Sequence, residues 1–122
     1  MKHMKVNDHE IKPGAYLAGV TLYYANLRDA DLRGANLQEA NLQGVGLYSA
    51  NLRDANLQAA KLVGANLKGA SLQGANLQWA WLYYANLEGA NLEGAILSPD
   101  MIWKYAKQLS VAKNLDKVIL KA

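Results

Sequence analysis

The hydrophobic positions of this chain recur every five residues. A leucine stands at every fifth position from Leu17 to Leu97, which makes seventeen leucines in register. Two positions before each leucine lies a small residue, which is alanine in fifteen cases and valine at Val20 and Val45. A period of five matches neither the period of about 3.6 of an α-helix nor the alternation of a flat strand. The pattern therefore predicts a repeat protein whose chain turns a corner once in every five residues.

Four of these repeats would form one square coil. In such a coil the leucine and the small residue before it point inward, and the other three positions point outward. Glycine is frequent two positions after the leucine, where a tight corner favours a positive φ. These corner glycines are Gly34, Gly44, Gly64, Gly69, Gly74, Gly89 and Gly94. With coils about 4.8 Å apart, the repeats predict about four coils and a shaft roughly 20 Å tall.

The inward leucines form the predicted core. They are Leu17, Leu22, Leu27, Leu32, Leu37, Leu42, Leu47, Leu52, Leu57, Leu62, Leu67, Leu72, Leu77, Leu82, Leu87, Leu92 and Leu97. One coil cannot bury its own leucine layer, so coils must stack and both open ends need a cap. We therefore expect an N-terminal cap segment (1–14), a repeat body (15–97) and a C-terminal cap (98–122) of one or two α-helices.

The C-terminal segment begins with the signals of a helix. Ser98 is the expected N-cap residue and Pro99 the first helical position. An apolar face follows, which suits a helix that lies across the last coil. Its residues are Met101, Ile102, Tyr105, Ala106 and Leu109. A second apolar pattern, Val111, Leu115, Val118 and Ile119, fits either a helix or a short edge strand, and the helix is our preferred interpretation.

The repeats resemble a known family. The segment 25–39 reads Ala-Asn-Leu-Arg-Asp-Ala-Asp-Leu-Arg-Gly-Ala-Asn-Leu-Gln-Glu, and it is similar to the pentapeptide-repeat proteins. The resemblance implies an all-β solenoid, namely a right-handed quadrilateral β-helix. It also implies a non-catalytic structural or protein-interaction module. An alternative comes from family members of the quinolone-resistance type, which protect bacterial topoisomerases by imitating DNA.

Composition excludes further classes of protein. The chain has no cysteine, which excludes a disulfide framework and a thiol nucleophile. Its first residues are polar, and no stretch approaches the roughly 18 apolar residues that a membrane span requires. We therefore expect a cytoplasmic protein with no membrane partner.

The distribution of charge bears on the partner. The formal net charge is +3, but the segment 15–97 carries five cations and six anions. The excess of positive charge lies in the tail, at Lys104, Lys107, Lys113, Lys117 and Lys121. A nearly neutral shaft argues against nucleic-acid binding, and it equally disfavours the DNA-mimicking alternative, which needs a strongly negative rod.

Candidate catalytic groups are few. His3 and His9 lie in the N-terminal segment without the spacing of metal ligands. The serines, Ser49, Ser71, Ser98 and Ser110, have no base nearby in the sequence. We therefore expect no enzyme activity, metal, cofactor or small-molecule substrate. We interpret the recurrent asparagines as structural, with side chains bonded to the backbone and to one another across coils.

Six aromatic residues occupy outward positions that other repeats fill with polar or small residues. They are Tyr23, Tyr24, Trp79, Trp81, Tyr83 and Tyr84. All except Trp79 fall on the side of the coil that carries Leu22 and Leu82, and Trp79 is at the preceding corner. Such a patch predicts either an interface or rings that shield small neighbours. The expected partner is a protein, and the chain itself is expected to be a monomer or a weak homodimer.

Overall fold

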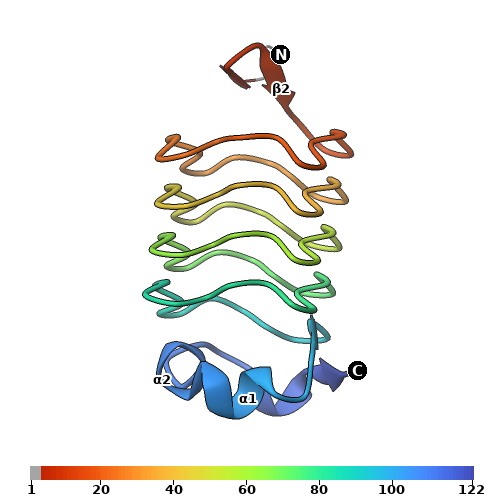
Figure 1. The fold of residues 1–122 in the computed structure, drawn as a ribbon, viewed down its shortest axis with the longest axis vertical. Helices are drawn as coiled ribbons and strands as arrows, with labels where there is room; N and C mark the ends of the chain where they lie inside the picture. Colours follow the sequence, from red (N-terminus) through yellow and green to blue (C-terminus); the bar gives the residue numbers. More distant parts are fainter. Residues whose placement is uncertain (1–3) are drawn as a thin grey trace.

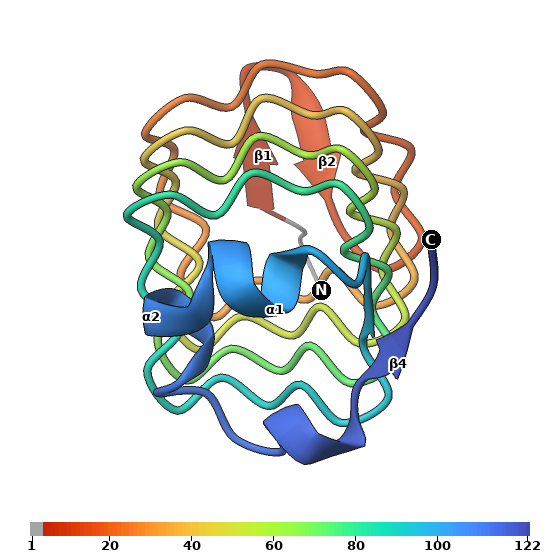
Figure 2. The same cartoon turned by 60° about the horizontal axis from the view of Figure 1, so that its bottom comes forward.

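A computed structural model describes residues 4–122 of the chain as a stack of coils (Figure 1). Parallel single-residue bridges join positions that are twenty residues apart, such as Tyr16 with Asn36 and Asn36 with Asn56. Four five-residue repeats therefore make one coil. Successive coils lie over one another with the same outline (Figure 2).

Each repeat closes with a tight turn. The N–H of Ala30, for example, donates to the C=O of Leu27 at 3.0 Å. The third residue of that turn, Asp29, has a φ of 60°. An i to i+3 hydrogen bond with a positive φ at the third residue is the geometry of a type II turn. The five-residue period is thus a short extended segment followed by a turn.

Hydrogen bonds between backbones hold neighbouring coils together. Leu27 N–H donates to Gly46 C=O at 2.7 Å, and Gly46 N–H donates to Ala25 C=O at 2.8 Å. The corner N–H of Asp29 adds a third bond, to Tyr48 C=O at 3.0 Å. Backbone groups that point toward the neighbouring coil are therefore paired by stacking, and each contact is a single bridge rather than a long strand.

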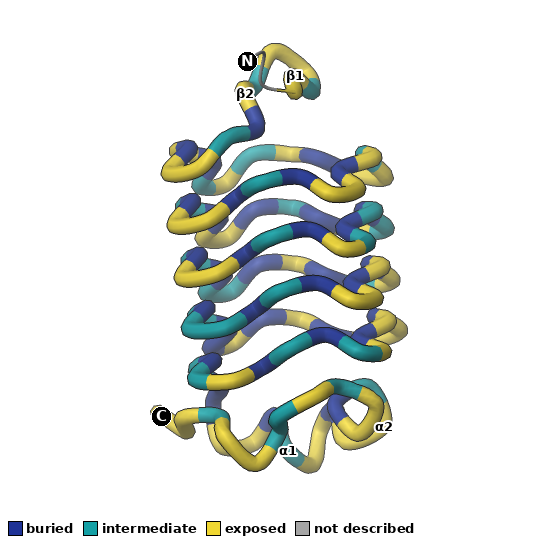
Figure 3. The backbone as a smooth tube through the Cα atoms, turned by 180° about the vertical axis from the view of Figure 1, so that it is seen from behind, coloured by how far each residue is buried: buried dark blue, intermediate teal, exposed yellow. Residues whose placement is uncertain are grey.

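The interior of the coils is a column of leucine and small residues. Each of the seventeen repeat leucines is at most 2% exposed. The small residues before them are also buried, apart from Val20 and Ala25 near the first coil, which are partly buried. Buried and exposed positions alternate along every coil (Figure 3). Burying one such leucine contributes about 1.5–3 kcal/mol, so the leucine column is the main source of stability.

The asparagine side chains bond within their own repeat. Asn56 Oδ1, for example, accepts the N–H of Gln58 at 3.0 Å, and the same bond recurs at eight further asparagines. We also expected asparagine side chains to bond to one another across coils. One such bond joins the tail to the last coil, where Asn114 Nδ2 donates to Asn91 Oδ1 at 2.9 Å. Asparagine is suited to this position because its side chain caps the N–H two residues on.

A hairpin lies at the N-terminal end. Strands β1 (Met4–Val6) and β2 (His9–Ile11) pair antiparallel and are joined by Asn7 and Asp8, which both have a positive φ. This is the backbone that a two-residue hairpin turn requires. Ile11 is only 3% exposed and belongs to the core, so the hairpin connects directly to the first coil.

Two short helices lie across the C-terminal end (Figure 2). They are α1 (Met101–Lys104) and α2 (Ala106–Leu109). Met101, Tyr105 and Leu109 are buried. These three residues are four apart, so they face the coil together. No helix within residues 4–122 is long and apolar enough to span a bilayer.

The start of α1 differs from the prediction. Asp100 rather than Ser98 holds the N-cap position, and its side chain makes no capping bond. Ser98 is instead 3% exposed, and its Oγ accepts the N–H of Trp79 at 3.1 Å. The hydroxyl replaces the backbone carbonyl that the next coil would have supplied. Ser98 therefore ends the coil instead of beginning the helix.

The last part of the tail is not the second α-helix that we preferred. It contains a short 3-10 helix, η1 (Leu115–Lys117), and strand β4 (Ile119–Leu120), which pairs parallel with β3 (Ile96–Leu97). Lys113 N–H donates to Ala90 C=O at 2.7 Å. The open edge of the last coil offers backbone partners that a helix cannot use, and extended chain satisfies them.

Candidate interaction site

The predicted aromatic residues are all exposed, but they form two groups. The exposed fractions range from 46% for Tyr83 to 85% for Tyr84. Tyr23 and Tyr24 lie near the N-terminal end of the shaft. The other four, Trp79, Trp81, Tyr83 and Tyr84, lie in the last coil, beside α1 and α2. The two groups have different surroundings, so they are described separately.

The N-terminal pair, Tyr23 and Tyr24, contacts residues of the neighbouring coil. The ring of Tyr24 covers Gly44, where even a single added methyl group would collide with it. The hydroxyl of Tyr23 accepts a hydrogen bond from Asn41 Nδ2 at 2.5 Å. Both rings therefore contact the coil that follows, as the shielding interpretation expects, although they remain exposed on their outer side.

Tyr84 occupies the same corner position as Tyr24, but no further coil lies beyond it. Corner side chains reach toward the next coil, as Tyr24 reaches Gly44 and Asp54 reaches Gly74. Beyond Tyr84 lie the helices instead, and its side chain remains the most exposed of the six. Tyr84 therefore lacks the contact with a following coil that Tyr24 has, because the repeat ends there.

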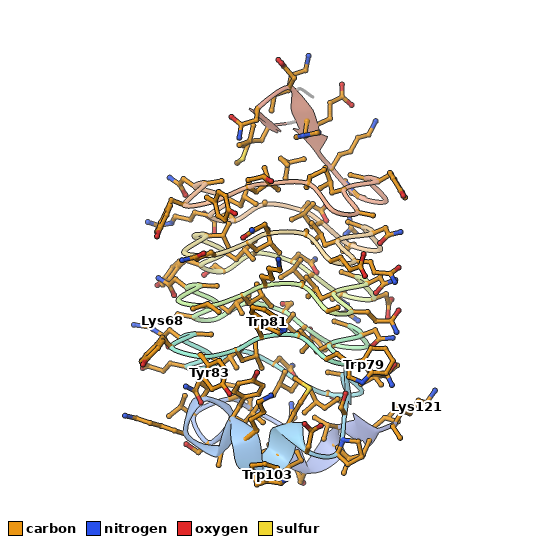
Figure 4. All side chains as sticks on the ribbon, viewed as in Figure 1. Lys68, Trp79, Trp81, Tyr83, Trp103 and Lys121 are labelled. Carbon is orange, nitrogen blue, oxygen red and sulfur yellow. The ribbon has the colours of Figure 1, made fainter. Side chains whose placement is uncertain are left out.

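A hollow lies between the last coil and α1. The ring of Tyr83 meets the buried ring of Tyr105 edge to face, with centroids 5.0 Å apart and planes at 77°. This contact holds the end of α1 beside the segment of the last coil that carries Trp81 and Tyr83, which are labelled in Figure 4. The hollow has a volume of about 550 Å³. Its lining residues are Val63, Trp81, Tyr83, Tyr84, Lys104 and Tyr105. A smaller hollow of about 180 Å³ adjoins it and shares Trp81, Lys104 and Tyr105.

Two lysines stand over the rings of this aromatic hollow. Lys104 Nζ is 5.8 Å from the centroid of the Tyr83 ring and 5.6 Å from that of Tyr105. Lys61 Nζ is 5.5 Å from the centroid of Trp81. These are cation–π distances. Within the part of the chain that the structure describes, neither ammonium forms a salt bridge. The site is thus aromatic with unneutralised positive charge.

The backbone edge beside the hollow is unpaired. In the coil above, Leu62 N–H donates to Trp81 C=O at 2.9 Å. The corresponding N–H groups of Leu82, Tyr84 and Leu87 have no hydrogen-bond partner among residues 4–122. Helices α1 and α2 occupy this edge, and a helix uses its backbone groups internally. Only water or a ligand can satisfy these donors.

The groups considered for catalysis are dispersed. No cluster of three or more possible metal ligands occurs within residues 4–122, and His3 lies outside these residues. Ser110 Oγ donates to Lys107 C=O at 2.9 Å. Elsewhere on the surface, the Asp31 carboxylate raises the pKa of Arg33 through a hydrogen bond and its charge. None of these groups adjoins the aromatic hollow.

Sequence reasoning missed part of the hollow. Trp81, Tyr83 and Tyr84 were predicted as interface residues, but Val63 and Lys104 were not. The missing signal was the position of α1. A buried face containing Met101 and Tyr105 places the residue before Tyr105 at the border of that face, so Lys104 lies at the rim of the coil.

Comparison with known proteins places these observations in a family. A family model of pentapeptide repeats matches residues 14–47, 50–83 and 82–98, with eight copies. No curated protein matches the chain significantly. A pentapeptide repeat protein from Nostoc is 30% identical, with a TM-score of 0.50, over 91% of this chain and 85% of that one.

Two other solved structures extend the comparison. A pentapeptide repeat protein from the Arabidopsis thaliana thylakoid lumen is 26% identical, with a TM-score of 0.48, over 86% of this chain and 80% of that one. A plasmid-mediated fluoroquinolone resistance protein is 19% identical, with a TM-score of 0.36, over 70% of this chain and 55% of that one. The repeat model spans most of the sequence, and the coils have the twenty-residue spacing of four repeats, so this chain belongs to the pentapeptide repeat family, whose fold is the right-handed quadrilateral β-helix.

Proposed function

We propose that this chain is a non-catalytic protein-interaction module whose contact surface is the aromatic hollow at its C-terminal end. The observation that carries the proposal is the group of Trp81, Tyr83 and Tyr84 around a hollow of about 550 Å³, exposed beside a helix that a buried tyrosine holds in place. Tyrosine and tryptophan offer a large contact area at a low cost in side-chain entropy, and they are enriched in binding hot spots.

The proposal restricts the contact surface to one end of the aromatic side. Tyr24 covers Gly44 and Tyr23 bonds to Asn41, so these rings already have partners within the chain. Trp81 and Tyr84 are exposed to a similar extent as this pair, but they line the hollow at the end of the shaft. The N-terminal pair therefore serves as an internal control for the C-terminal group.

The test is a matched pair of double variants. In the first, Trp81→Asn and Tyr84→Gly introduce the residues that most other repeats carry at these positions. In the second, at the other end, Tyr23→Gln introduces the residue that occurs most often at that position, and Tyr24→Gly introduces the common corner glycine. Because glycine suits the corner φ of 60° at Tyr84, the first variant should keep the parent's melting temperature within a few degrees.

Affinity capture followed by titration with the purified captured protein gives the readout. We expect the parent and the Tyr23→Gln/Tyr24→Gly variant to bind with similar affinity, and the Trp81→Asn/Tyr84→Gly variant to lose at least tenfold, or about 1.4 kcal/mol. If all three chains bind the same proteins equally, or if none binds any protein, the proposed function is wrong.

A further inference from the structure

We infer that the aromatic hollow binds an acidic segment of the partner protein, with one apolar side chain of that segment inserted between Trp81 and Tyr83. The inference rests on the proposed function and specifies the chemistry of the partner. It combines two independent features of the same site, namely its shape and its charge.

The shape provides for an apolar anchor. Trp81 and Tyr83 both point outward from one extended segment, two residues apart, with inward Leu82 between them. Val63, from the preceding coil, and the rim of α1 complete the lining. An exposed concave surface of this composition favours the burial of an aromatic or branched aliphatic side chain. The hollow therefore recognises an apolar side chain rather than a polar surface.

The positive charge around the hollow indicates which residues flank the apolar side chain in the partner. Lys104 stands over Tyr83 and Lys61 over Trp81, so both rings already face a cation from the chain itself. A cationic ligand would be repelled by these two ammonium groups. No carboxylate lines this hollow, so the two lysines are available to carboxylates of a partner. Asp100 lines only the smaller adjoining hollow.

An acidic partner also supplies hydrogen-bond acceptors. The N–H of Tyr84, at the border of the hollow, has no partner among residues 4–122. A carboxylate or a peptide carbonyl can accept this donor, whereas a basic side chain cannot. Shape and charge therefore favour the same ligand class, and the N–H of Tyr84 is compatible with it. Nucleic acid is disfavoured, because a row of phosphates needs many more cations than these two.

Fluorescence anisotropy with three labelled peptides tests the inference on the full chain. In the first peptide, glutamates flank a central phenylalanine. The second replaces the glutamates with lysines, and the third replaces the phenylalanine with serine. We expect the first peptide to bind at least tenfold more tightly than either of the others, and its affinity to fall as the salt concentration rises.

Charge reversal separates specific binding from a general effect of charge. The variant Lys61→Glu/Lys104→Glu should lose the glutamate peptide by at least tenfold and gain affinity for the lysine peptide. Lys68→Glu/Lys121→Glu, an equal reversal at two exposed residues that do not line the hollow, should bind like the parent. Unchanged melting temperatures of these variants confirm that the fold is intact.

Several results would overturn the inference. One is equal affinity of the parent for the glutamate and lysine peptides, and another is an equal loss with Lys68→Glu/Lys121→Glu. A third is no detectable binding of any peptide, or tighter binding of a single-stranded oligonucleotide. Capture of a partner through Trp81 and Tyr84 would still support the proposed function in each case, so the two failures are distinguishable.

Discussion

Every corner of the repeat adopts a positive φ, whatever residue occupies it. The corner glycines share this backbone with Tyr24, Ala59, Trp79 and Tyr84, whose φ values lie between 55° and 61°. In this region a residue with a Cβ is strained by roughly 1–2 kcal/mol. Neighbouring coils impose the corner through hydrogen bonds on both sides. Side chains with a Cβ at corners therefore lower stability unless they provide a contact in return.

Ala59 and Gly64 allow this strain to be measured. Ala59→Gly should raise the free energy of unfolding by up to about 1 kcal/mol, because relief of the strain exceeds the added freedom of the unfolded chain. Gly64→Ala should lower it by about 1 kcal/mol or more, although the added Cβ meets nothing within 4 Å. Thermal and chemical unfolding provide the measurement. A neutral Gly64→Ala substitution would show that the corner is not strained.

The five-residue period determines which residues point inward and which residues lie at corners. The leucine register identifies the inward column, and a shift of twenty residues identifies which corner lies under which ring, as with Tyr24 and Gly44. Lys104 has no place in that register. Its position over Tyr83 depends on how α1 packs, and no repeat pattern specifies helix packing. The rings of the candidate site, and Lys61 twenty residues before Trp81, were therefore predictable from the period, but Lys104 was not.

At the scale of elements, the tail combines two kinds of cap. Helices α1 and α2 cover one part of the last coil with apolar side chains, and the extended chain that follows pairs with another part through backbone bonds. The pattern of Val111, Leu115, Val118 and Ile119 suits helix and strand alike, so the sequence alone could not decide. Competition for the free edge near Ala95 and Leu97 decides it, because a strand forms bonds there that a helix does not.

Deletion of residues 118–122 tests the contribution of β4. It removes the hydrogen bonds of three donors: Ile119 N–H to Ala95 C=O at 2.8 Å, Lys121 N–H to Leu97 C=O at 2.9 Å, and Gln78 Nε2, which is shared between Lys121 C=O at 3.0 Å and Ala122 C=O at 3.3 Å. Three hydrogen bonds at about 0.5–1.5 kcal/mol each predict a loss of about 1.5–4.5 kcal/mol in the free energy of unfolding.

A control variant keeps the backbone of β4 but changes its side chains. Ile119 and Leu120 are 46% and 49% exposed, so Ile119→Thr/Leu120→Thr retains strand propensity and all three backbone groups. We expect urea unfolding to show a clearly smaller loss for this variant than for the deletion. Equal losses would mean that apolar contact, and not edge pairing, is the role of β4.

At the scale of the whole molecule, the leucine core is the same in every coil, and the coils differ in their outward residues. Every coil presents the same leucine layer inward, so position along the shaft is marked only by outward residues. The charges of the repeat body nearly cancel, with five cations and six anions in the segment 15–97. Such a surface does not reproduce the field of a polyanion, so the DNA-mimicking alternative has no support from the charge distribution.

Uniform coils also mean that repeats can be added without destroying the fold. A copy of the repeat 50–54 inserted after Asp54 adds a quarter of a coil, and the inserted leucine joins the core column. The insertion moves the segment from Ala55 onward by one side relative to the segment before it. Tyr23 and Tyr24 then lie on a different side from Trp81. We expect circular dichroism to show a cooperative transition within a few degrees of the parent's.

This insertion decides whether the aromatic side functions as one strip or only at its end. All residues of the hollow, from Val63 to Tyr105, lie after the insertion and keep their mutual positions. The captured partner should therefore bind the inserted chain within about twofold of its affinity for the parent, a difference below about 0.5 kcal/mol. A copy of the coil 35–54, inserted at the same place, keeps the two aromatic groups on one side and serves as the control. If the five-residue insertion abolishes binding while the twenty-residue insertion preserves it, the alignment of both groups is required, and the contact surface extends along the shaft to Tyr23 and Tyr24.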